Sequence, residues 1–151
     1  MAMTMTGEVE LAAPQDVVWA RLNDPEVLKA CIPGCESLEK VSDTAFEAVA
    51  KLKIGPVSAR FSGRVELSDI DAPNGYTISG EGQGGIAGFA KGGAKVHLRP
   101  AGTGTVMSYD VEAHVGGKIA QLGSRLVASV AKKNADEFFA NFAKVFAPPG
   151  S

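Results

Sequence analysis

Residues 56–68 read PVSARFSGRVELS and decide the class of fold. Apolar residues or glycine occupy every second position from Val57 to Leu67, and serine, arginine and glutamate fill the positions between them. Strict alternation of this kind is typical of a strand with one face in the core and the other in water, as in antiparallel sheets. The sequence therefore predicts a half-buried antiparallel strand over this stretch.

The segment before it, from Phe46 to Ile54, alternates in the same way, and Gly55-Pro56 separates the two as the turn of a hairpin. Turn-forming residues at 71–75 and 100–104 divide the sequence that follows into further strands. About seven strands are predicted in all, over residues 4–11, 36–41, 46–54, 56–68, 76–83, 86–99 and 105–115.

Three helices are predicted beside these strands. Two short ones follow Pro14 and Asp24, because proline suits the first turn of a helix and aspartate suits its N-cap. From Gly117 to Val145 apolar residues recur every three or four positions, which indicates one long amphipathic helix of about thirty residues and roughly 45 Å. Residues 147–151 are predicted to be a disordered tail.

A run of strands closed by a helix indicates an α+β domain in which an antiparallel sheet buries one apolar face. We expect a single domain over residues 1–151, with a curved seven-stranded sheet, two short helices and the long C-terminal helix over its concave face. A chain of this length buries a core large enough to be stable without disulfides or metals.

The composition excludes several function classes. Fifteen basic residues against 17 acidic ones give a net charge of -2, which argues against nucleic acid. A membrane-spanning helix and a signal peptide are not predicted, so the chain is expected in the cytoplasm. Cys31 and Cys35 are expected to be free thiols, and His97 and His114 to lie on the outer face of the sheet. No metal, cofactor or catalytic group is predicted.

The predicted inner face is rich in small residues, in keeping with 18 glycines in the whole chain. Alanine or glycine in place of leucine leaves space between sheet and helix, which a ligand would fill. The alternative is that small residues let the helix approach the sheet closely, and the sequence does not decide between the two interpretations. The small members of the inner face are Ala48, Ala50, Ala59, Gly63, Gly80, Gly82, Gly92, Ala94 and Ala113.

Residues on this face and on the apolar stripe of the long helix are the candidate ligand-binding set. Met107 and Tyr109 share one strand, and methionine is an adaptable wall for an apolar ligand. Asn134 falls between Val130 and Phe138 on the stripe, where its amide needs a partner such as a ligand carbonyl, the backbone or water. The predicted set is Phe46, Ala50, Phe61, Ile78, Gly82, Met107, Tyr109, Leu126, Val130, Asn134 and Phe138.

Two further motifs carry weaker signals. Residues 80–85 contain a G-x-G-x-x-G pattern, but strand-like sequence follows it where a dinucleotide site requires a helix. Lys118, Arg125 and Lys132 recur every seven residues along the predicted long helix. Such a stripe is usually a solvated flank, with anionic lipid or an acidic partner as the alternative.

Several segments resemble one known family over almost the whole chain. Its most distinctive segments here are Ile-Pro-Gly-Cys-Glu at 32–36 and Gly-Gly-Lys-Ile-Ala-Gln-Leu-Gly at 116–123. The matches at 24–28, 53–57 and 104–109 agree with them. On these residues the chain resembles the CoxG family of carbon monoxide dehydrogenase, within the START and Bet v 1-like superfamily of helix-grip folds.

The resemblance implies a non-enzymatic accessory protein of a molybdenum-containing hydroxylase of the carbon monoxide dehydrogenase type. It also implies a quinone or lipid in an apolar cavity, with a role in membrane recruitment or electron-acceptor delivery. Peripheral contact with the inner face of the cell membrane is part of that expectation. Two alternatives stay open, namely a cyclase- or hydratase-like enzyme using the same cavity, and a docking factor with a filled core.

Overall fold

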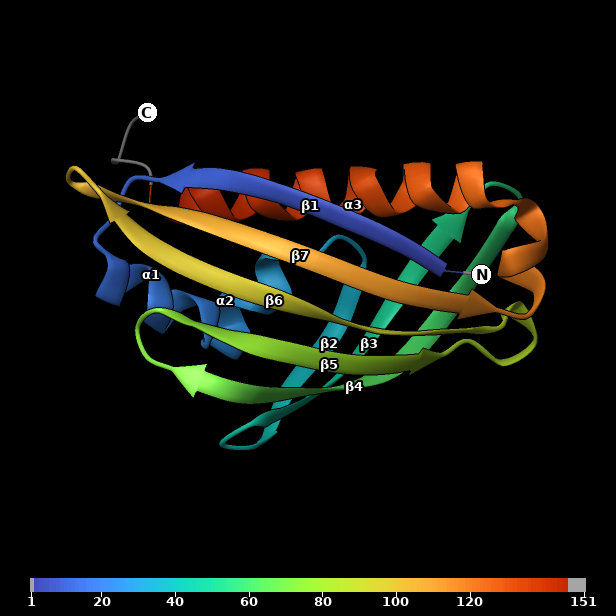
Figure 1. The fold of residues 1–151 in the computed structure, drawn as a ribbon. Coiled ribbons are helices and arrows are strands. Elements are labelled where there is room, and N and C mark those ends of the chain that lie inside the picture. The colour runs from blue at the N-terminus through green and yellow to red at the C-terminus, as the bar shows by residue number, and fades with distance from the viewer. Residues whose placement is uncertain (1, 147–151) are drawn as a thin grey trace.

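The computed structural model describes residues 2–146, so Met1 and the predicted tail at 147–151 lie outside the described residues. Seven strands form one antiparallel sheet in the order β1-β7-β6-β5-β4-β3-β2, which confirms the predicted class (Figure 1). The strands are β1 (Ala2–Leu11), β2 (Cys35–Ser42), β3 (Ala45–Ile54), β4 (Val57–Asp71), β5 (Gly75–Gln83), β6 (Phe89–Ala101) and β7 (Gly104–Gly116).

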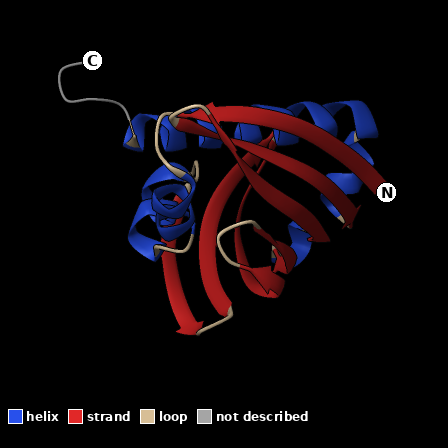
Figure 2. Ribbon diagram, turned by 60° about the vertical axis from the view of Figure 1, so that its left-hand side comes forward, coloured by secondary structure: helices blue, strands red, loops and turns tan. Residues whose placement is uncertain are grey.

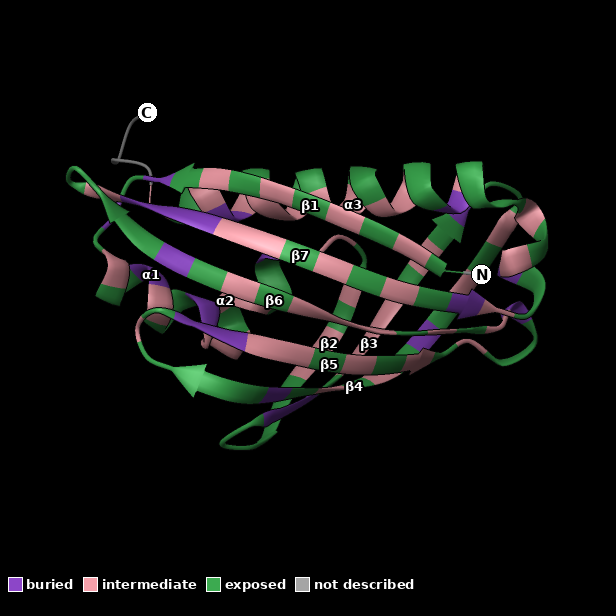
Figure 3. Cartoon of the chain, in the orientation of Figure 1, coloured by how far each residue is buried: buried purple, intermediate pink, exposed green. Residues whose placement is uncertain are grey.

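The register of the hairpin β3–β4 explains the alternation that identified it. Phe61 lies opposite Ala50, and Ala59 lies opposite Leu52, so apolar residues of neighbouring strands share one face. Exposed and less exposed residues therefore alternate along the strands (Figure 3). The inner-face residues predicted from each strand separately fall on one common side of the sheet.

Two short helices, α1 (Gln15–Leu22) and α2 (Pro25–Cys31), follow β1. Asp24 is the N-cap of α2, and its carboxylate accepts a hydrogen bond from the Glu26 backbone N–H at 3.0 Å. This satisfies one of the free donors at the start of a helix, as the sequence predicted.

The C-terminal helix is shorter than predicted. A 3-10 helix η2 (Lys118–Leu122) comes first, and α3 (Ser124–Val145) begins only after Gly123, whose φ of +98° interrupts the helical backbone. Its 22 residues give a length of about 33 Å in place of the expected 45 Å. A second 3-10 helix, η1 (Gly85–Ala87), replaces the start of the strand predicted at 86–99.

Helix α3 bridges the two margins of the curled sheet, with its closest backbone approaches to β1 on one side and β3 on the other. Figure 2 shows the helix lying across the sheet, which curves beneath it. This is the helix-grip arrangement. None of the helices within residues 2–146 is both long enough and apolar enough to cross a bilayer.

The core is divided between the two ends of the space under α3. At one end, here called the aromatic end, Trp19, Tyr76, Phe138, Phe142 and Phe146 pack with α1, α2 and the adjoining strands. At the other, here called the glycine end, the connections at 54–57, 83–89 and 116–124 meet. Its core cluster contains the buried residues Ile54, Phe61, Ala87, Val115, Ile119 and Val127.

Candidate functional site

Residues that face each other across the middle of the space beneath α3 are only partly buried. The buried residues of α3 are Val127 and Phe142, one near each end, and the positions between them are partly or fully exposed. The facing positions of the sheet likewise stay partly accessible, although they carry apolar side chains or glycine. These sheet positions are Ala48, Gly63, Ile78, Gly80, Gly82, Gly92, Ala94, Val111 and Ala113.

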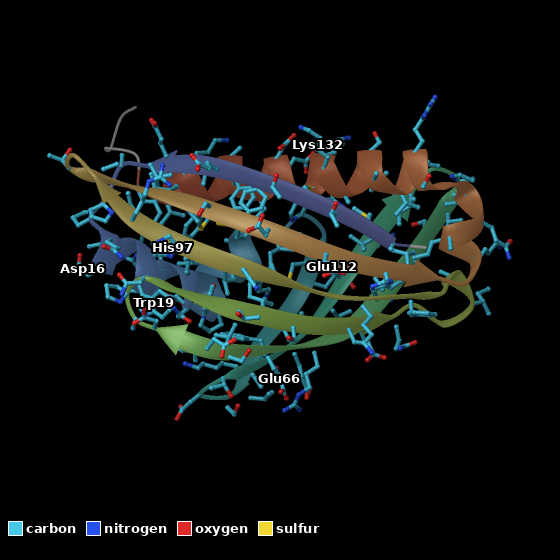
Figure 4. All side chains as sticks on the ribbon, in the orientation of Figure 1. Asp16, Trp19, Glu66, His97, Glu112 and Lys132 are labelled. Carbon is cyan, nitrogen blue, oxygen red and sulfur yellow. The ribbon has the colours of Figure 1, made fainter. Side chains whose placement is uncertain are left out.

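This partly open stretch is apolar because charged side chains point the other way. In β1, β3, β5, β6 and β7 every charged residue and both histidines take the outer-face register, as His97 and Glu112 illustrate (Figure 4). No group of three His, Cys, Asp or Glu residues within 2–146 is placed to hold a metal ion. The inner face is therefore suited to an uncharged, lipophilic occupant.

Asn134 is the polar exception on the facing side of α3. Its amide makes no hydrogen bond to another described residue and is not sealed from solvent. Asn141, two turns further along, is instead engaged, because its Nδ2 donates to the Cys31 carbonyl at 3.0 Å. Of the two asparagines, only Asn134 has a side chain with no hydrogen bond to a described residue.

Three of the predicted ligand residues are packed inside the core clusters. Met107 is 2% exposed at the aromatic end, Phe46 is buried against Leu67 and Tyr76, and Phe61 is buried at the glycine end. Tyr109 is on the inner face, but its ring stacks on Phe139 with centroids 4.5 Å apart. It also lies over Gly7, where an added Cβ would be 2.3 Å from the Tyr109 hydroxyl.

The remaining predicted residues lie along the partly open stretch or at its margins. Ala50, Ile78, Gly82 and Val130 are partly exposed there together with Asn134. Leu126 packs against the core of the glycine end, and Phe138 against that of the aromatic end. The set missed Val111, Ala94 and Met5, although the same two-residue alternation assigns all three to the inner face.

The inner-face glycines do two different things. A Cβ on Gly82 would meet nothing closer than the Ser62 carbonyl at 3.9 Å, so there is room above it. A Cβ on Gly92 would lie 2.2 Å from the Glu112 carbonyl, and one on Gly63 would lie 2.9 Å from the Glu81 carbonyl. The latter two glycines permit close approach of neighbouring strands, and Gly82 adds to the open space.

The two cysteines are free, as predicted. Cys31 is buried at the end of α2, and Cys35 is half-buried at the start of β2. Desolvation is the main cause that raises the pKa of each thiol, so both are protonated at neutral pH. A reactive thiolate at this position is therefore not favoured.

The outer face of the sheet carries a shallow depression of about 1020 Å³. All of its charged lining residues take the outer-face register, and Ile78, Gly80, Gly92, Ala94 and Val111 of the inner-face register border it as well. A strongly twisted sheet is saddle-shaped, so its outer face is hollow along one diagonal. The charged residues of the depression are Arg64, Glu66, Glu81, Lys91, Lys95, Asp110 and Glu112, and their signs alternate across the strands.

The predicted stripe of cations along the long helix is interrupted. Lys118 belongs to η2 and not to α3, because the break at Gly123 turns the backbone. Lys132 Nζ donates to Asp136 Oδ2 at 2.9 Å, which raises the pKa of Lys132 and partly neutralises its charge. Lys118 and Arg125 form no ion pair within residues 2–146.

Comparison with solved structures gives the same architecture. A conserved protein from Geobacillus kaustophilus is 32% identical, with 95% of each chain covered and a TM-score of 0.88. A START superfamily protein from Mycobacterium smegmatis has a TM-score of 0.72 at 13% identity, over 95% of this chain and 96% of that one. Ara h 8.0201 has a TM-score of 0.65 at 18% identity, over 97% and 98% of the two chains.

The first of these similarities extends to sequence, and the other two show the fold alone. No curated protein matches the chain. The family model for CoxG of carbon monoxide dehydrogenase matches residues 7–147, which include all the distinctive segments quoted above and both ends of the space beneath α3. The chain belongs to the CoxG family of carbon monoxide dehydrogenase.

Proposed function

We propose that this chain carries a lipophilic small molecule, a quinone or a lipid, in the partly open stretch beneath α3. In this role it is a non-catalytic accessory protein of a molybdenum-containing hydroxylase of the carbon monoxide dehydrogenase type. It aids recruitment of that enzyme to the membrane or delivery of its electron acceptor. The observation that supports the proposal most is the uncovered apolar inner face between two closed core clusters.

Partly exposed apolar residues on an inner face have a cost that a bound ligand would remove. Interiors normally pack without voids, and each Å² of apolar surface taken from water contributes about 25 cal/mol. Val111, Ile78 and Val130 lie on opposite walls of the stretch and would contact an apolar occupant from both sides. A flat, largely apolar head with an apolar chain fits these walls better than a charged metabolite does.

Asn134 supplies the polar contact that a quinone needs. A quinone carbonyl accepts hydrogen bonds, and the free amide of Asn134 is a donor on an otherwise apolar helix face. A hydrogen bond made in such surroundings contributes about 0.5–1.5 kcal/mol net. This contact favours a carbonyl-bearing head group over a plain hydrocarbon.

The inner face is poorly equipped for catalysis. In β1, β3, β5, β6 and β7 its titratable groups are the hydroxyls of Tyr76 and Tyr109, since the charged residues of these strands take the outer register. Strand β2 adds the protonated thiol of Cys35, opposite Ala50, and the exposed amine of Lys40, opposite Phe46. Burial raises the pKa of Tyr76 to about 12, so this hydroxyl stays protonated at neutral pH and is a weak base. This chemistry supports binding rather than acid–base turnover.

The experiment compares two asparagine variants with the parent chain. Menaquinone and ubiquinone are added to each purified protein, and uptake is measured by native mass spectrometry. We expect Asn134→Ala to weaken quinone binding about three- to tenfold with little change in stability, since its amide has no partner within residues 2–146. We expect Asn141→Ala to lower the free energy of unfolding by about 1 kcal/mol and to leave binding unchanged.

Two outcomes would count against the proposal. If the parent chain takes up neither quinone and releases no apolar molecule on organic extraction, it is not a carrier of this kind. If Asn134→Ala and Asn141→Ala weaken binding equally, the amide of Asn134 has no special role in holding the head group.

A further inference from the structure

The side chain of Ile86 is unusual because the fold holds it out in solvent. It is 92% exposed, whereas the other exposed large apolar side chains of the described residues are between 39% and 46% exposed. It lies in η1, at the tip of the connection between β5 and β6. A large apolar side chain that stays in solvent adds nothing to the stability of the core.

The turn that carries Ile86 is well anchored. The Gly84 N–H donates to the Gly88 carbonyl at 2.8 Å, and the Gly88 N–H donates to the Gly85 carbonyl at 3.1 Å. Ala87, the next residue, is buried beside Ile119 in the core of the glycine end. One short turn therefore fixes one side chain in the core and presents its neighbour to the outside.

The second connection at this end lies directly against the first. A Cβ on Gly117 would be 2.5 Å from the Gly88 Cα, so the two backbones are in contact, and Figure 1 shows the two connections side by side at one end of the molecule. Lys118 follows Gly117, and Arg125 lies in the first turn of α3. Both cations are exposed and unpaired within residues 2–146.

Acidic residues are absent from the three connections of the glycine end. The segments 48–65, 82–109 and 113–135 contain neither aspartate nor glutamate, and they supply all three connections. Asp16, Asp24 and Glu26 lie instead on or beside α1 and α2, beyond the other end of the space. A chain of net charge -2 therefore has a basic tip at the glycine end.

From these observations we infer that the glycine end is a docking tip for an anionic lipid bilayer, with Ile86 inserted at the interface and Lys118 and Arg125 against the headgroups. A protruding Ile86, with the less exposed Phe89 in the same connection and cations beside it, suits a bilayer, which needs only local insertion and charge attraction. A stable protein interface needs a much larger complementary patch, of roughly 800 Å² on each partner. The inference rests on the membrane-recruitment part of the proposed function, to which it adds the surface that meets the bilayer.

The test uses flotation of the full chain with vesicles of phosphatidylcholine, with and without phosphatidylglycerol. We expect binding to the anionic vesicles and its loss at high salt. Ile86→Ser should weaken binding roughly tenfold, given the apolar area removed from the lipid. Ile70→Ser is the matched control, because Ile70 is 46% exposed on β4, away from the glycine end.

A charge-reversal pair tests the headgroup contact. Lys118→Glu with Arg125→Glu should reduce binding more than about tenfold, since each cation near an anionic surface is worth about fivefold in affinity. Lys29→Glu with Lys40→Glu is the control pair, which makes the same change in net charge but on α2 and β2. We expect the control pair to bind anionic vesicles more strongly than the tip pair does. All the substituted positions are exposed, so we expect thermal unfolding to stay unchanged in every variant.

Several results would overturn the inference. The first is that the parent chain does not float with anionic vesicles. The second is that Ile86→Ser binds the vesicles as well as the parent does, and the third is that tip and control variants lose vesicle binding equally. Binding of the tip to an acidic protein in place of vesicles would also overturn it. Menaquinone uptake in vesicle-free solution is measured in parallel, so that failed docking with normal uptake refutes the tip and spares the carrier function.

Discussion

The two ends of the space beneath α3 are closed by different physical means. At the aromatic end, Phe142 is 0% exposed and stacks on Phe138 with ring centroids 5.8 Å apart, and Trp19 packs on Tyr76 at 5.2 Å. At the glycine end, Phe61 is the one aromatic member of the buried cluster, and Gly88 and Gly117 bring two backbones into contact. One end is closed by side-chain volume and the other by backbone approach.

This difference predicts different sensitivities to substitution. Where volume closes the core, removing atoms leaves a cavity and lowers stability. Where backbones touch, adding even one methyl group forces them apart. In the partly open stretch the outcome depends on the position, because a Cβ has room at Gly82 but would meet a neighbouring backbone at Gly63 and Gly92.

The largest effect is expected for Phe142→Ala at the aromatic end. The ring is fully buried and contacts Phe138 and Phe146, so its removal should lower the free energy of unfolding by about 3–5 kcal/mol. Denaturant unfolding followed by circular dichroism measures this. Val145→Ala, at an exposed position three residues further on, should change it by less than about 0.5 kcal/mol. Similar losses in both variants would contradict the assignment of the core.

The next effect concerns pH and the same end. Burial raises the pKa of Tyr76 to about 12 from its ordinary 10, so the folded state holds this proton more tightly than the unfolded state does. The stability contributed by the protonated hydroxyl is fully present below pH 10 and is lost as the pH rises toward 12. At about 1.4 kcal/mol per pKa unit, the loss is somewhat under 3 kcal/mol.

Tyr76→Phe isolates this contribution. We expect the parent chain to lose stability relative to the variant between pH 10 and 12. Unfolding at several pH values, with tyrosinate absorbance recorded alongside, gives both the stability and the ionisation. Parallel pH profiles of the two proteins would show that Tyr76 is not shielded from water.

A smaller effect is expected for Gly88→Ala at the glycine end. The Gly88 φ is +117°, and an added Cβ would lie 2.1 Å from the Gly116 carbonyl, so we expect a loss of about 2 kcal/mol. Gly102→Ala is the matched control, since Gly102 also has a positive φ but open space where the Cβ would be. It should cost about 1 kcal/mol. If the two variants lose the same stability in thermal unfolding, backbone contact is not what closes this end.

The sequence predicted the sheet well because alternation reports directly which face a strand residue takes. The hairpin of β3 and β4 and the cap at Asp24 were predicted and are confirmed. The break at Gly123 was missed because apolar spacing continues across it, from Leu122 to Leu126. Hydrophobic periodicity does not reveal a positive φ at a single glycine.

The candidate site was predicted less completely. Membership of the inner face follows from alternation, but whether an inner-face residue is packed or open depends on the elements above it. Gly82 and Gly92 look alike in sequence, yet a Cβ has room at one and would meet a neighbouring backbone at the other. The exposure of Ile86 likewise depends on the turn of η1, which strand-like sequence around it concealed.

The central claim is that the stretch beneath α3 is an apolar ligand site, and filling it tests this most directly. Menaquinone uptake is measured by native mass spectrometry for the parent chain, for Gly82→Leu and for Gln83→Leu, which adds the same side chain to the exposed outer face of β5. A Leu side chain at Gly82 has room to enter the open stretch. We expect uptake by the parent and by Gln83→Leu, and loss of uptake in a folded Gly82→Leu. Undiminished uptake by Gly82→Leu, or none by the parent, would contradict it.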